Sequence, residues 1–287
     1  MKKSFWIIAA MAGVLFTACE NGDRDFPDFK YSAVYFAYQS PIRTITLGED
    51  PSVDNSLDNE HKCQIMATIA GVYENKKNVE IGIRVDNSLC DGYTFESTKG
   101  DIMPLPTSHY TLSDDKIVIK KGQVLGGVTV NLTDAFFNDP KATELNYVIP
   151  VVMTGVQNAD SILEGKPSVD TPDRVNKEDW EVQSKDYILY AVKYISKYDS
   201  HYLRRGVDTY TGNKTGTEVR HAANVEKDET IGGFSTLGLN KVQWERPTKD
   251  AAGKNVEANL ILTFDESGNC VITSNTEGVE ANGKNLN

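Results

Sequence analysis

Residues for catalysis and metal binding are sparse in this sequence. It has four histidines and four cysteines in 287 residues and no C-x-x-C pair, which excludes the usual structural zinc motifs. It lacks a G-x-S-x-G nucleophile elbow, and the glycines and lysines of "KKGQVLGG" do not follow the P-loop order. The histidines stand in polar contexts without partner spacing and are interpreted as surface or turn residues: His61, His109, His201 and His221.

Acidic residues are abundant but form no glycosidase signature. Glycoside hydrolysis needs two placed carboxylates, and the chain has neither an acidic D-x-x-D-x-D-x-E run nor a (β/α)-barrel pattern. In the acidic loop, Asp50, Asp54 and Asp58 are spaced unlike an EF-hand, which favours a solvated loop over a calcium site. We therefore predict a protein that is not an enzyme and needs no cofactor or metal.

The net charge is strongly negative. It is −11 for the whole chain and −13 without residues 1–18, which contain two lysines and no acids. A surface this acidic disfavours the binding of nucleic acid or anionic lipid through its bulk, while neutral and cationic ligands stay possible.

The apolar run at the N-terminus is too short to span a membrane. Lys2 and Lys3 precede residues 5–16, "FWIIAAMAGVLF", which have the length of an export-signal core rather than the roughly 20 residues of a spanning helix. Two small residues then precede Cys19, which resembles a bacterial lipobox, although Phe16 stands where Leu, Val or Ile is usual. We predict a lipoprotein signal peptide over residues 1–18 and a lipid on Cys19. A plain secretory peptide or a short anchor helix is the alternative.

Residues 19–29 are predicted to be an acidic tether. The segment is charged and contains glycine, which is typical of a flexible chain, and it carries Glu20, Asp23, Asp25 and Asp28. Acidic residues just after the lipid-bearing cysteine resemble the surface-export signal of Bacteroidota lipoproteins. We therefore expect the protein to be lipid-anchored in the outer membrane and to face the cell exterior.

The remaining chain predicts an all-β fold of two domains. Short alternating segments at about ten-residue spacing over residues 30–160 indicate an immunoglobulin-like β-sandwich. Residues 161–185 are polar and are interpreted as a linker. Residues 186–287 return to β-type alternation and predict an antiparallel, barrel-like (lipocalin-like) domain. The polar end after "TFDESGNCVI" has no closing strand, so this domain is expected to be incomplete.

One pair of cysteines is a disulfide candidate. The alternating segments 63–73 and 79–86 flank the turn "ENKKN" and are predicted to form a hairpin. That hairpin would bring Cys63 within one position of Cys90 in cross-strand register, and the export compartment permits oxidation. We predict a Cys63–Cys90 disulfide, with two buried free thiols as the alternative.

Several long segments resemble a two-domain family of Bacteroidota surface lipoproteins. They are "VYFAYQSPIRTITLGED", "VDNSLCDGY", "GGVTVNLTDAFFNDPKATELNYVIPVVMT" and "DYILYAVKYISKYDSHYLRRG". The resemblance implies an N-terminal domain of unknown function that is shared with glycan-binding lipoproteins and some endo-acting glycosidases, followed by a family-specific β-barrel-like domain. It also implies an accessory role in polysaccharide utilisation beside an outer-membrane porin and its lid lipoprotein.

Glycan binding is the function that these expectations favour. Sugars stack their apolar faces on aromatic rings and bind polar side chains through their hydroxyl groups. The candidate ligand-binding residues are a Trp platform with its polar neighbours in "KVQWERP", and a Tyr and an Arg in "HYLRRG": Trp244, Gln243, Arg246, Tyr202 and Arg204. Their alternative role is structural. The alternative functions are an outer-membrane assembly lipoprotein with a protein partner, and a glycosidase accessory module.

Overall fold

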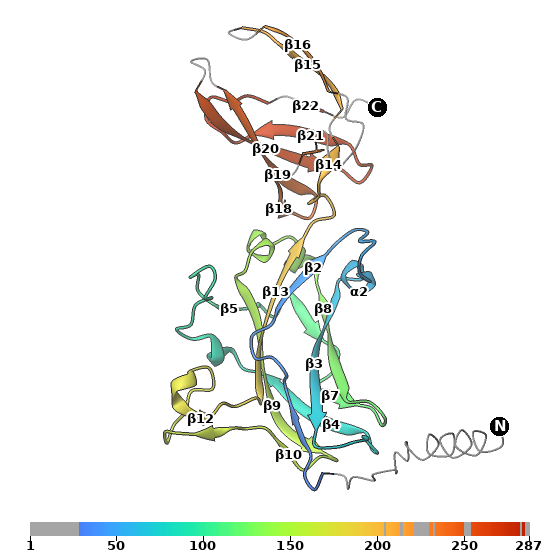
Figure 1. The fold of residues 1–287 in the computed structure, drawn as a ribbon, viewed down its shortest axis with the longest axis vertical. Coiled ribbons are helices and arrows are strands. Elements are labelled where there is room, and N and C mark those ends of the chain that lie inside the picture. Colours follow the sequence, from blue (N-terminus) through green and yellow to red (C-terminus); the bar gives the residue numbers. More distant parts are fainter. Residues whose placement is uncertain are drawn as a thin grey trace, which may run out of the picture.

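The computed structural model describes residues 29–203, 205–212, 215–220, 230–231, 233–249, 254–281 and 283–284. The predicted lipid-bearing Cys19 and the candidate Arg204 lie outside these residues. The described chain is built mainly from β-strands in two domains stacked end to end (Figure 1), which confirms the predicted all-β fold. Within the described ranges, no helix has the length and apolar character needed to cross a bilayer.

The strands of the first domain bury every second side chain. In β3 (Lys62–Ala70) the buried side chains run from Cys63 to Ile69 in steps of two, and β4 (Val79–Val85) repeats this pattern. A period of two residues places one face of each strand in the core. The other strands are β1 (Ala33–Tyr35), β2 (Ile42–Thr46), β5 (Met103–Pro104), β6 (Tyr110–Leu112), β7 (Lys116–Ile119), β8 (Leu125–Leu132), β9 (Tyr147–Gln157), β10 (Ser161–Ile162) and β13 (Tyr187–Ile195).

These eleven strands form one curled sheet. The order is β10-β1-β3-β8-β7-β4-β9-β13-β2, with β5 beside β9 and β6 beside β8. The inward faces enclose one hydrophobic cluster, to which β3 contributes Ile65, β8 Val128 and β13 Val192. Short helical turns connect the strands: α2 (Ser56–Asn59), α3 (Asp134–Phe137), η1 (Asn87–Cys90), η2 (Pro140–Thr143) and η3 (Lys177–Asp179).

Strand β13 belongs to the first domain, so the domain boundary predicted at residue 186 is wrong. β13 pairs antiparallel with β9, where Tyr187 lies opposite Val152, and parallel with β2, where Ala191 lies opposite Ile42. The strand follows a long polar stretch in the sequence and therefore resembles the start of a new domain. Its partners show instead that it completes the first sheet.

Residues 161–185 are an excursion on the first domain rather than a linker between domains. β10 pairs with β1, and β11 (Lys166–Pro167) pairs with β12 (Trp180–Val182). The excursion closes on itself, because the backbone N–H of Lys185 donates to the carbonyl of Leu163 at 2.8 Å. The prediction of a linker is therefore corrected.

The second domain is an antiparallel meander. Five strands follow one another in the order β18-β19-β20-β21-β22, and two separate strand pairs, β14 with β17 and β15 with β16, lie outside this sheet. The strands are β14 (Tyr202–Leu203), β15 (Gly206–Tyr210), β16 (Gly216–Arg220), β17 (Thr230–Ile231), β18 (Phe234–Gly238), β19 (Lys241–Lys249), β20 (Asn255–Phe264), β21 (Cys270–Ser274) and β22 (Gly283–Lys284).

Hydrogen bonds join the two domains directly after β13. The backbone N–H of the buried Ser196 donates to Thr236 Oγ1 at 2.9 Å, and Ser196 Oγ donates to the carbonyl of Leu239 at 2.7 Å. The side chain of Leu239 also packs against the core of the first domain. The junction is therefore a bonded contact rather than a free tether.

The predicted Cys63–Cys90 disulfide is not formed, because β3 and β4 do not pair with each other. β3 lies between β1 and β8, and β4 lies between β7 and β9. Cys63 is opposite Val130 of β8 and belongs to the main core, whereas Cys90 packs in a smaller cluster with Phe95. Both residues are buried free cysteines.

Thiol titration tests this correction. The unfolded, unreduced chain should give three thiols, from Cys63, Cys90 and Cys270, because all three are free. In the folded protein Cys270 should react first, since burial raises the pKa of both Cys63 and Cys90 to about 11. A single reactive thiol in the unfolded chain would mean that the Cys63–Cys90 disulfide does form. Four reactive thiols would mean that Cys19 carries no lipid.

Candidate functional site

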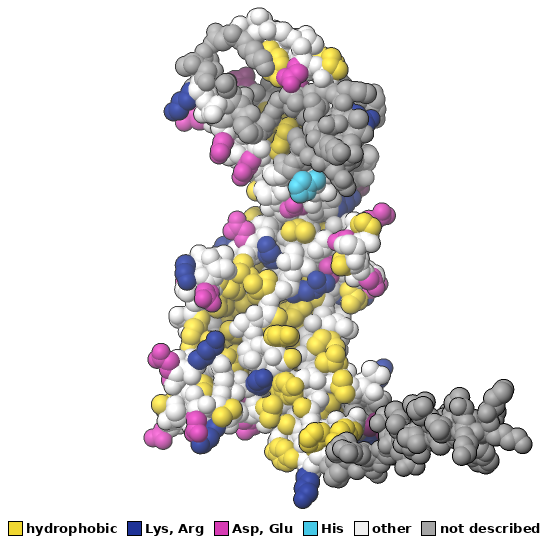
Figure 2. Space-filling view, viewed as in Figure 1, with side chains coloured by type: hydrophobic (Ala, Val, Ile, Leu, Met, Phe, Trp, Pro, Cys, Tyr) yellow, Lys and Arg dark blue, Asp and Glu magenta, His cyan; other side chains and the backbone are white. Residues whose placement is uncertain are grey.

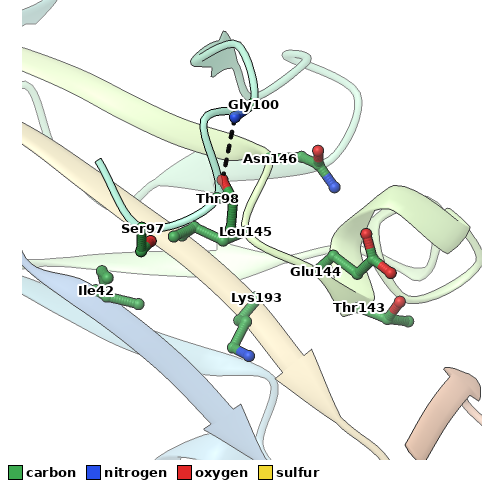
Figure 3. Close-up of a pocket in the computed structure, with 9 residues that line it drawn as sticks. All are labelled: Ile42, Ser97, Thr98, Gly100, Thr143, Glu144, Leu145, Asn146 and Lys193. Atoms are coloured by element: carbon green, nitrogen blue, oxygen red, sulfur yellow. Dashed lines mark hydrogen bonds between the residues drawn. The ribbon is translucent and has the colours of Figure 1, made fainter. Parts of the chain in front are cut away.

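An open groove lies on the outer face of the first sheet. It has a volume of about 660 Å³, and apolar, hydroxyl, amide and charged side chains line it together. Figure 3 shows these side chains arriving from two strands and from two connecting segments. They are Ile42, Ser97, Thr98, Gly100, Thr143, Glu144, Leu145, Asn146 and Lys193.

Strand alternation creates the floor of the groove. In β13 the side chains of Tyr190, Val192 and Tyr194 point into the core, so Lys193 points outward. In the parallel neighbour β2, Ile42 also points outward and is 57% exposed. The floor therefore pairs an apolar side chain with an ammonium group.

The first wall is the turn over residues 95–100. Phe95 anchors it by packing in the outer-face cluster with Cys90. The backbone N–H of Phe95 donates to the carbonyl of Gly100, and that of Lys99 donates to the carbonyl of Phe95, both at 2.8 Å. Lys99 takes a φ of 58°, which closes the turn tightly. The turn thus holds the hydroxyl groups of residues 97 and 98 at the rim.

The second wall is the end of η2 and the segment that follows it. Asp139 accepts a hydrogen bond from the Lys141 N–H at 2.9 Å, which caps the first turn of η2. The Asn146 side chain donates to the Lys141 carbonyl at 2.9 Å and so ties the segment back onto the helix. These bonds fix the backbone that carries Glu144 and Leu145 into the groove.

The groove suits a neutral ligand that has both hydroxyl groups and apolar faces. Within the described part of the chain, Lys193 has no carboxylate at ion-pair distance, so its ammonium group is available to a ligand. Lys193 and the hydroxyl groups can donate to ligand oxygens, Glu144 can accept, and Ile42 and Leu145 offer apolar contact. Among the described residues, no group of three His, Cys, Asp or Glu side chains is placed to hold a metal.

A second hollow of about 490 Å³ lies over the irregular pairing of β4 with β9. Its charged side chains include Lys116 and Glu80, whose Nζ and Oε2 atoms are 2.8 Å apart. Because these two charges already compensate each other, this hollow offers a ligand less than the first groove does.

The predicted Trp244 platform lies within an aromatic stack of the second domain. Trp244 is opposite Phe234 in the β18–β19 pair, and the two rings stack with centroids 5.7 Å apart. The Tyr202 ring also contacts Phe234. It lies edge-on to the Phe234 ring, and the two ring centroids are 4.9 Å apart. Trp244 is half-buried and Phe234 is buried.

The other residues predicted around Trp244 are not gathered with it on one face. Gln243 is its neighbour along β19 and therefore points to the opposite side of the sheet. The side chain of Arg246 and the whole of Arg204 lie outside the described residues. Binding by this set stays a prediction, while the structure shows what else Trp244 and Tyr202 contact.

The structure also brings together a serine, a histidine and an aspartate that have no recognisable spacing in the sequence. Ser108 Oγ lies 3.0 Å from His109 Nδ1, and His109 Nε2 lies 3.1 Å from Asp139 Oδ2. Tyr147 also donates to Asp139 Oδ2, at 2.6 Å. Burial opposes ionisation of Asp139, but the hydrogen bonds from Tyr147, the Lys141 N–H and His109 hold its pKa below the usual value. The aspartate thus connects η2 to β9, so these contacts give the cluster a structural role.

The groove residues escaped sequence reasoning because they come from four separate parts of the chain. Lys193 gave one usable signal, since it is the single charged residue in the strand "YILYAVKYI". A charge at an outward position of an otherwise apolar strand indicates a site or a surface. Residues 97–100 and 143–146 carry no such signal, because hydroxyl and amide residues are common in any turn.

Comparisons with known proteins cover both domains. Residues 29–160 match a family model described as "-like, N-terminal domain", and residues 197–285 match a domain of unknown function, DUF5627. The match of DUF5627 begins directly after β13, in agreement with the corrected boundary. A search of curated proteins found no significant match.

Solved structures from Bacteroides species resemble the chain to different degrees. A multidomain Bacteroides ovatus protein including DUF1735 is 13% identical, with a TM-score of 0.42, and the match covers 86% of this chain and 72% of that one. An auxiliary nutrient binding protein from Bacteroides thetaiotaomicron is 11% identical, with a TM-score of 0.40 and coverages of 84% and 70%. Values this low support no conclusion about a ligand.

A third structure is much more similar. It is a Bacteroides ovatus protein of unknown function that is 45% identical, with a TM-score of 0.84, and the match covers 89% of this chain and 81% of that one. The chain therefore belongs to the family of this Bacteroides ovatus protein.

Proposed function

We propose that the protein is a non-catalytic, lipid-anchored protein of the outer-membrane surface that binds a glycan in the groove of its first domain. The observation that carries the proposal is the groove itself, which Lys193 and hydroxyl groups line together with the apolar side chains of Ile42 and Leu145 (Figure 3). Such a mixture matches the alternating hydroxyl groups and apolar faces of sugars. The N-terminal sequence supports the surface address, since it has the order of a lipoprotein signal that ends at Cys19.

The role would be that of an accessory in polysaccharide capture. The resemblance to surface glycan-binding lipoproteins supports this role, with a porin and its lid lipoprotein as the partners that would receive the glycan. The hydrogen-bonded junction at Ser196 is compatible with this role, because it would hold the second domain in a constant position relative to the groove.

A binding experiment with paired variants tests the groove. A glycan array with the mature chain identifies an oligosaccharide, and calorimetry then measures its affinity. Lys193→Ala should weaken binding about tenfold or more, because a hydrogen bond from a charged donor contributes about 1.5–3 kcal/mol. Lys177→Ala removes an exposed lysine elsewhere on the same domain and should leave binding unchanged.

The outcomes separate the site from the function. Unchanged glycan affinity in Lys193→Ala would reject the groove as the binding site but keep glycan binding as the function. If Trp244→Ala alone then lost affinity, the site would lie in the second domain. Absence of binding to plant, host and microbial glycans would reject the function.

A protein partner is the second candidate function, and one observation favours it. The two-stranded pair β15–β16 lies outside the main sheet of the second domain, and its cross-strand pair Val207 and Val219 is 60% and 68% exposed. Exposed apolar side chains on a projecting strand pair are typical of a protein contact. Co-purification of an envelope protein that is lost in a Val207→Ser, Val219→Ser variant would support an assembly role.

A further inference from the structure

Four loops meet at the end of the first domain that lies opposite the second domain. Residues 29–32, 71–78, 120–125 and 157–160 form this surface, which we name the basal tip. The buried side chain of Asn75 ties two of the loops, since it donates to the carbonyls of Lys120 and Gln123 at 3.1 and 3.0 Å. Asn158 and Ser32 tie the other two, because Asn158 donates to the Asn78 carbonyl and Ser32 donates to Asp160.

The basal tip is locally positive in a strongly negative protein. It carries five exposed lysines and two acidic residues, whereas the whole chain has a net charge of −11. One of the acids, Asp160, already accepts hydrogen bonds from the backbone and side chain of Ser32. The lysines are Lys30, Lys76, Lys77, Lys120 and Lys121.

Exposed apolar side chains accompany these lysines. Phe29 and Tyr73 are 62% and 60% exposed, with ring centroids 5.3 Å apart, and Tyr31 is exposed beside them. Val124 and Leu125 at the start of β8 are also exposed. Figure 2 shows hydrophobic side chains gathered at this lower end of the domain. Aromatic rings with neighbouring lysines are typical of a surface that rests at a membrane interface.

The described residues begin at the basal tip. Phe29 is the first described residue, and Cys19 precedes it by ten residues, which span at most about 35 Å when fully extended. A lipid on Cys19 would therefore keep the membrane within reach of the tip. The acidic bulk of the protein would face away from the membrane.

We propose that the basal tip docks on an anionic lipid surface, with its lysines contacting lipid phosphates and its aromatic rings lying at the interface. The proposal rests on the proposed lipid anchor at Cys19 and adds an orientation to it. The docked protein stands upright, so that the second domain and the groove are held away from the membrane. Binding of anionic lipid is thus confined to the tip, although the bulk charge disfavours it elsewhere.

Amide hydrogen exchange of the mature chain on vesicles tests the docking. One vesicle is phosphatidylcholine, and the other contains about one-third phosphatidylglycerol. Each lysine near an anionic surface strengthens association about fivefold. Amides of residues 71–78 and 120–125 should therefore exchange at least about tenfold more slowly on the anionic vesicle than on the neutral one. High salt should remove this difference by screening.

Two matched variants assign the effect to the tip. Changing Lys76, Lys77, Lys120 and Lys121 to Gln should abolish the slowing. A control changes four exposed lysines outside the tip to Gln and should preserve it, although it alters the net charge equally: Lys99, Lys141, Lys177 and Lys241.

The remaining results either overturn tip docking or distinguish it from membrane attachment through a lipid on Cys19. Equal exchange on both vesicles, or equal loss in both variants, overturns tip docking. Slow exchange without any vesicle also overturns it, because the acidic tether would then cover the lysines. Flotation with neutral vesicles reports the anchor alone. A chain that floats only with anionic vesicles, and no longer does so in the tip variant, would have a docking tip without a lipid on Cys19.

Discussion

Replacing Phe137 with alanine is expected to lower the free energy of unfolding by about 3–5 kcal/mol, as is usual for a large buried aromatic side chain. Phe137 is 2% exposed, and its ring centroid lies 4.1 Å from that of His61 and 5.1 Å from that of Tyr194. Its carbonyl also accepts a hydrogen bond from the Tyr194 hydroxyl at 2.7 Å. Alanine would leave a cavity that these aromatic rings cannot fill.

The same substitution should weaken ligand binding in the groove. α3 ends at Phe137 and leads into η2, whose last residues continue as the wall that carries Glu144 and Leu145. Loosening the anchor of this segment would move the wall. Urea denaturation and calorimetry of Phe137→Ala check both effects.

Two further variants keep the test specific. Phe137→Leu should cost less than alanine, because it refills most of the cavity. Tyr38→Ala removes an aromatic ring that is 77% exposed and should change stability by no more than about 0.5 kcal/mol. A cost below about 1 kcal/mol for Phe137→Ala would show that the aromatic cluster is not a rigid part of the core.

The sequence predicted individual strands far better than their partners. Alternation alone located the strands now seen over Lys62–Ala70 and Val79–Val85, because burial of one sheet face imposes a period of two. It could not tell that β3 pairs with β8, some sixty residues later, rather than with its neighbour in sequence. Pairing depends on the packing of the whole core, and the disulfide inferred from the hairpin failed for that reason.

The candidate site was harder to predict than the fold. Trp244 stood out because its sequence neighbours Gln243 and Glu245 are polar. On a strand, however, these neighbours point to the opposite face, and Trp244 faces Phe234. The groove carries no motif, since its side chains come together only when β2 pairs with β13 at the edge of the sheet.

Replacing Asp58 with alanine should lower the free energy of unfolding by about 3 kcal/mol, because it removes hydrogen bonds to a charged, buried group. The Asp58 side chain is 2% exposed and forms an ion pair with Arg43 of β2. It also accepts the backbone N–H of Thr46 at 2.9 Å. This carboxylate therefore holds the end of β2 against α2. The interpretation of Asp58 as part of a solvated acidic loop is wrong, because its side chain is buried in the folded chain. Chemical denaturation measures the cost, with the exposed Asp170→Ala as a control that should be close to neutral.

Replacing the partner, Arg43, with alanine should lower the free energy of unfolding further. Arg43 is 39% exposed, so water can solvate its charge when Asp58 is removed. Asp58 has no such access, and Arg43→Ala would leave a buried carboxylate with the Thr46 N–H as its remaining hydrogen bond. We expect the loss of unfolding free energy in Arg43→Ala to exceed that in Asp58→Ala by about 1 kcal/mol, because Arg43→Ala leaves a buried charge without a partner. The opposite order would mean that the carboxylate acts mainly by docking α2.

Replacing both Arg43 and Asp58 by apolar residues distinguishes the effect of a buried charge on stability from the effect of side-chain packing. An Arg43→Met, Asp58→Leu variant buries no charge and should be more stable than Arg43→Ala alone. It would still lose the bond to the Thr46 N–H, so β2 should be held less firmly than in the natural protein. Ile42, which precedes Arg43 on the same strand, points to the opposite face and lies in the floor of the groove. Ligand affinity should therefore fall in this variant even where stability recovers, because the floor depends on the position of β2.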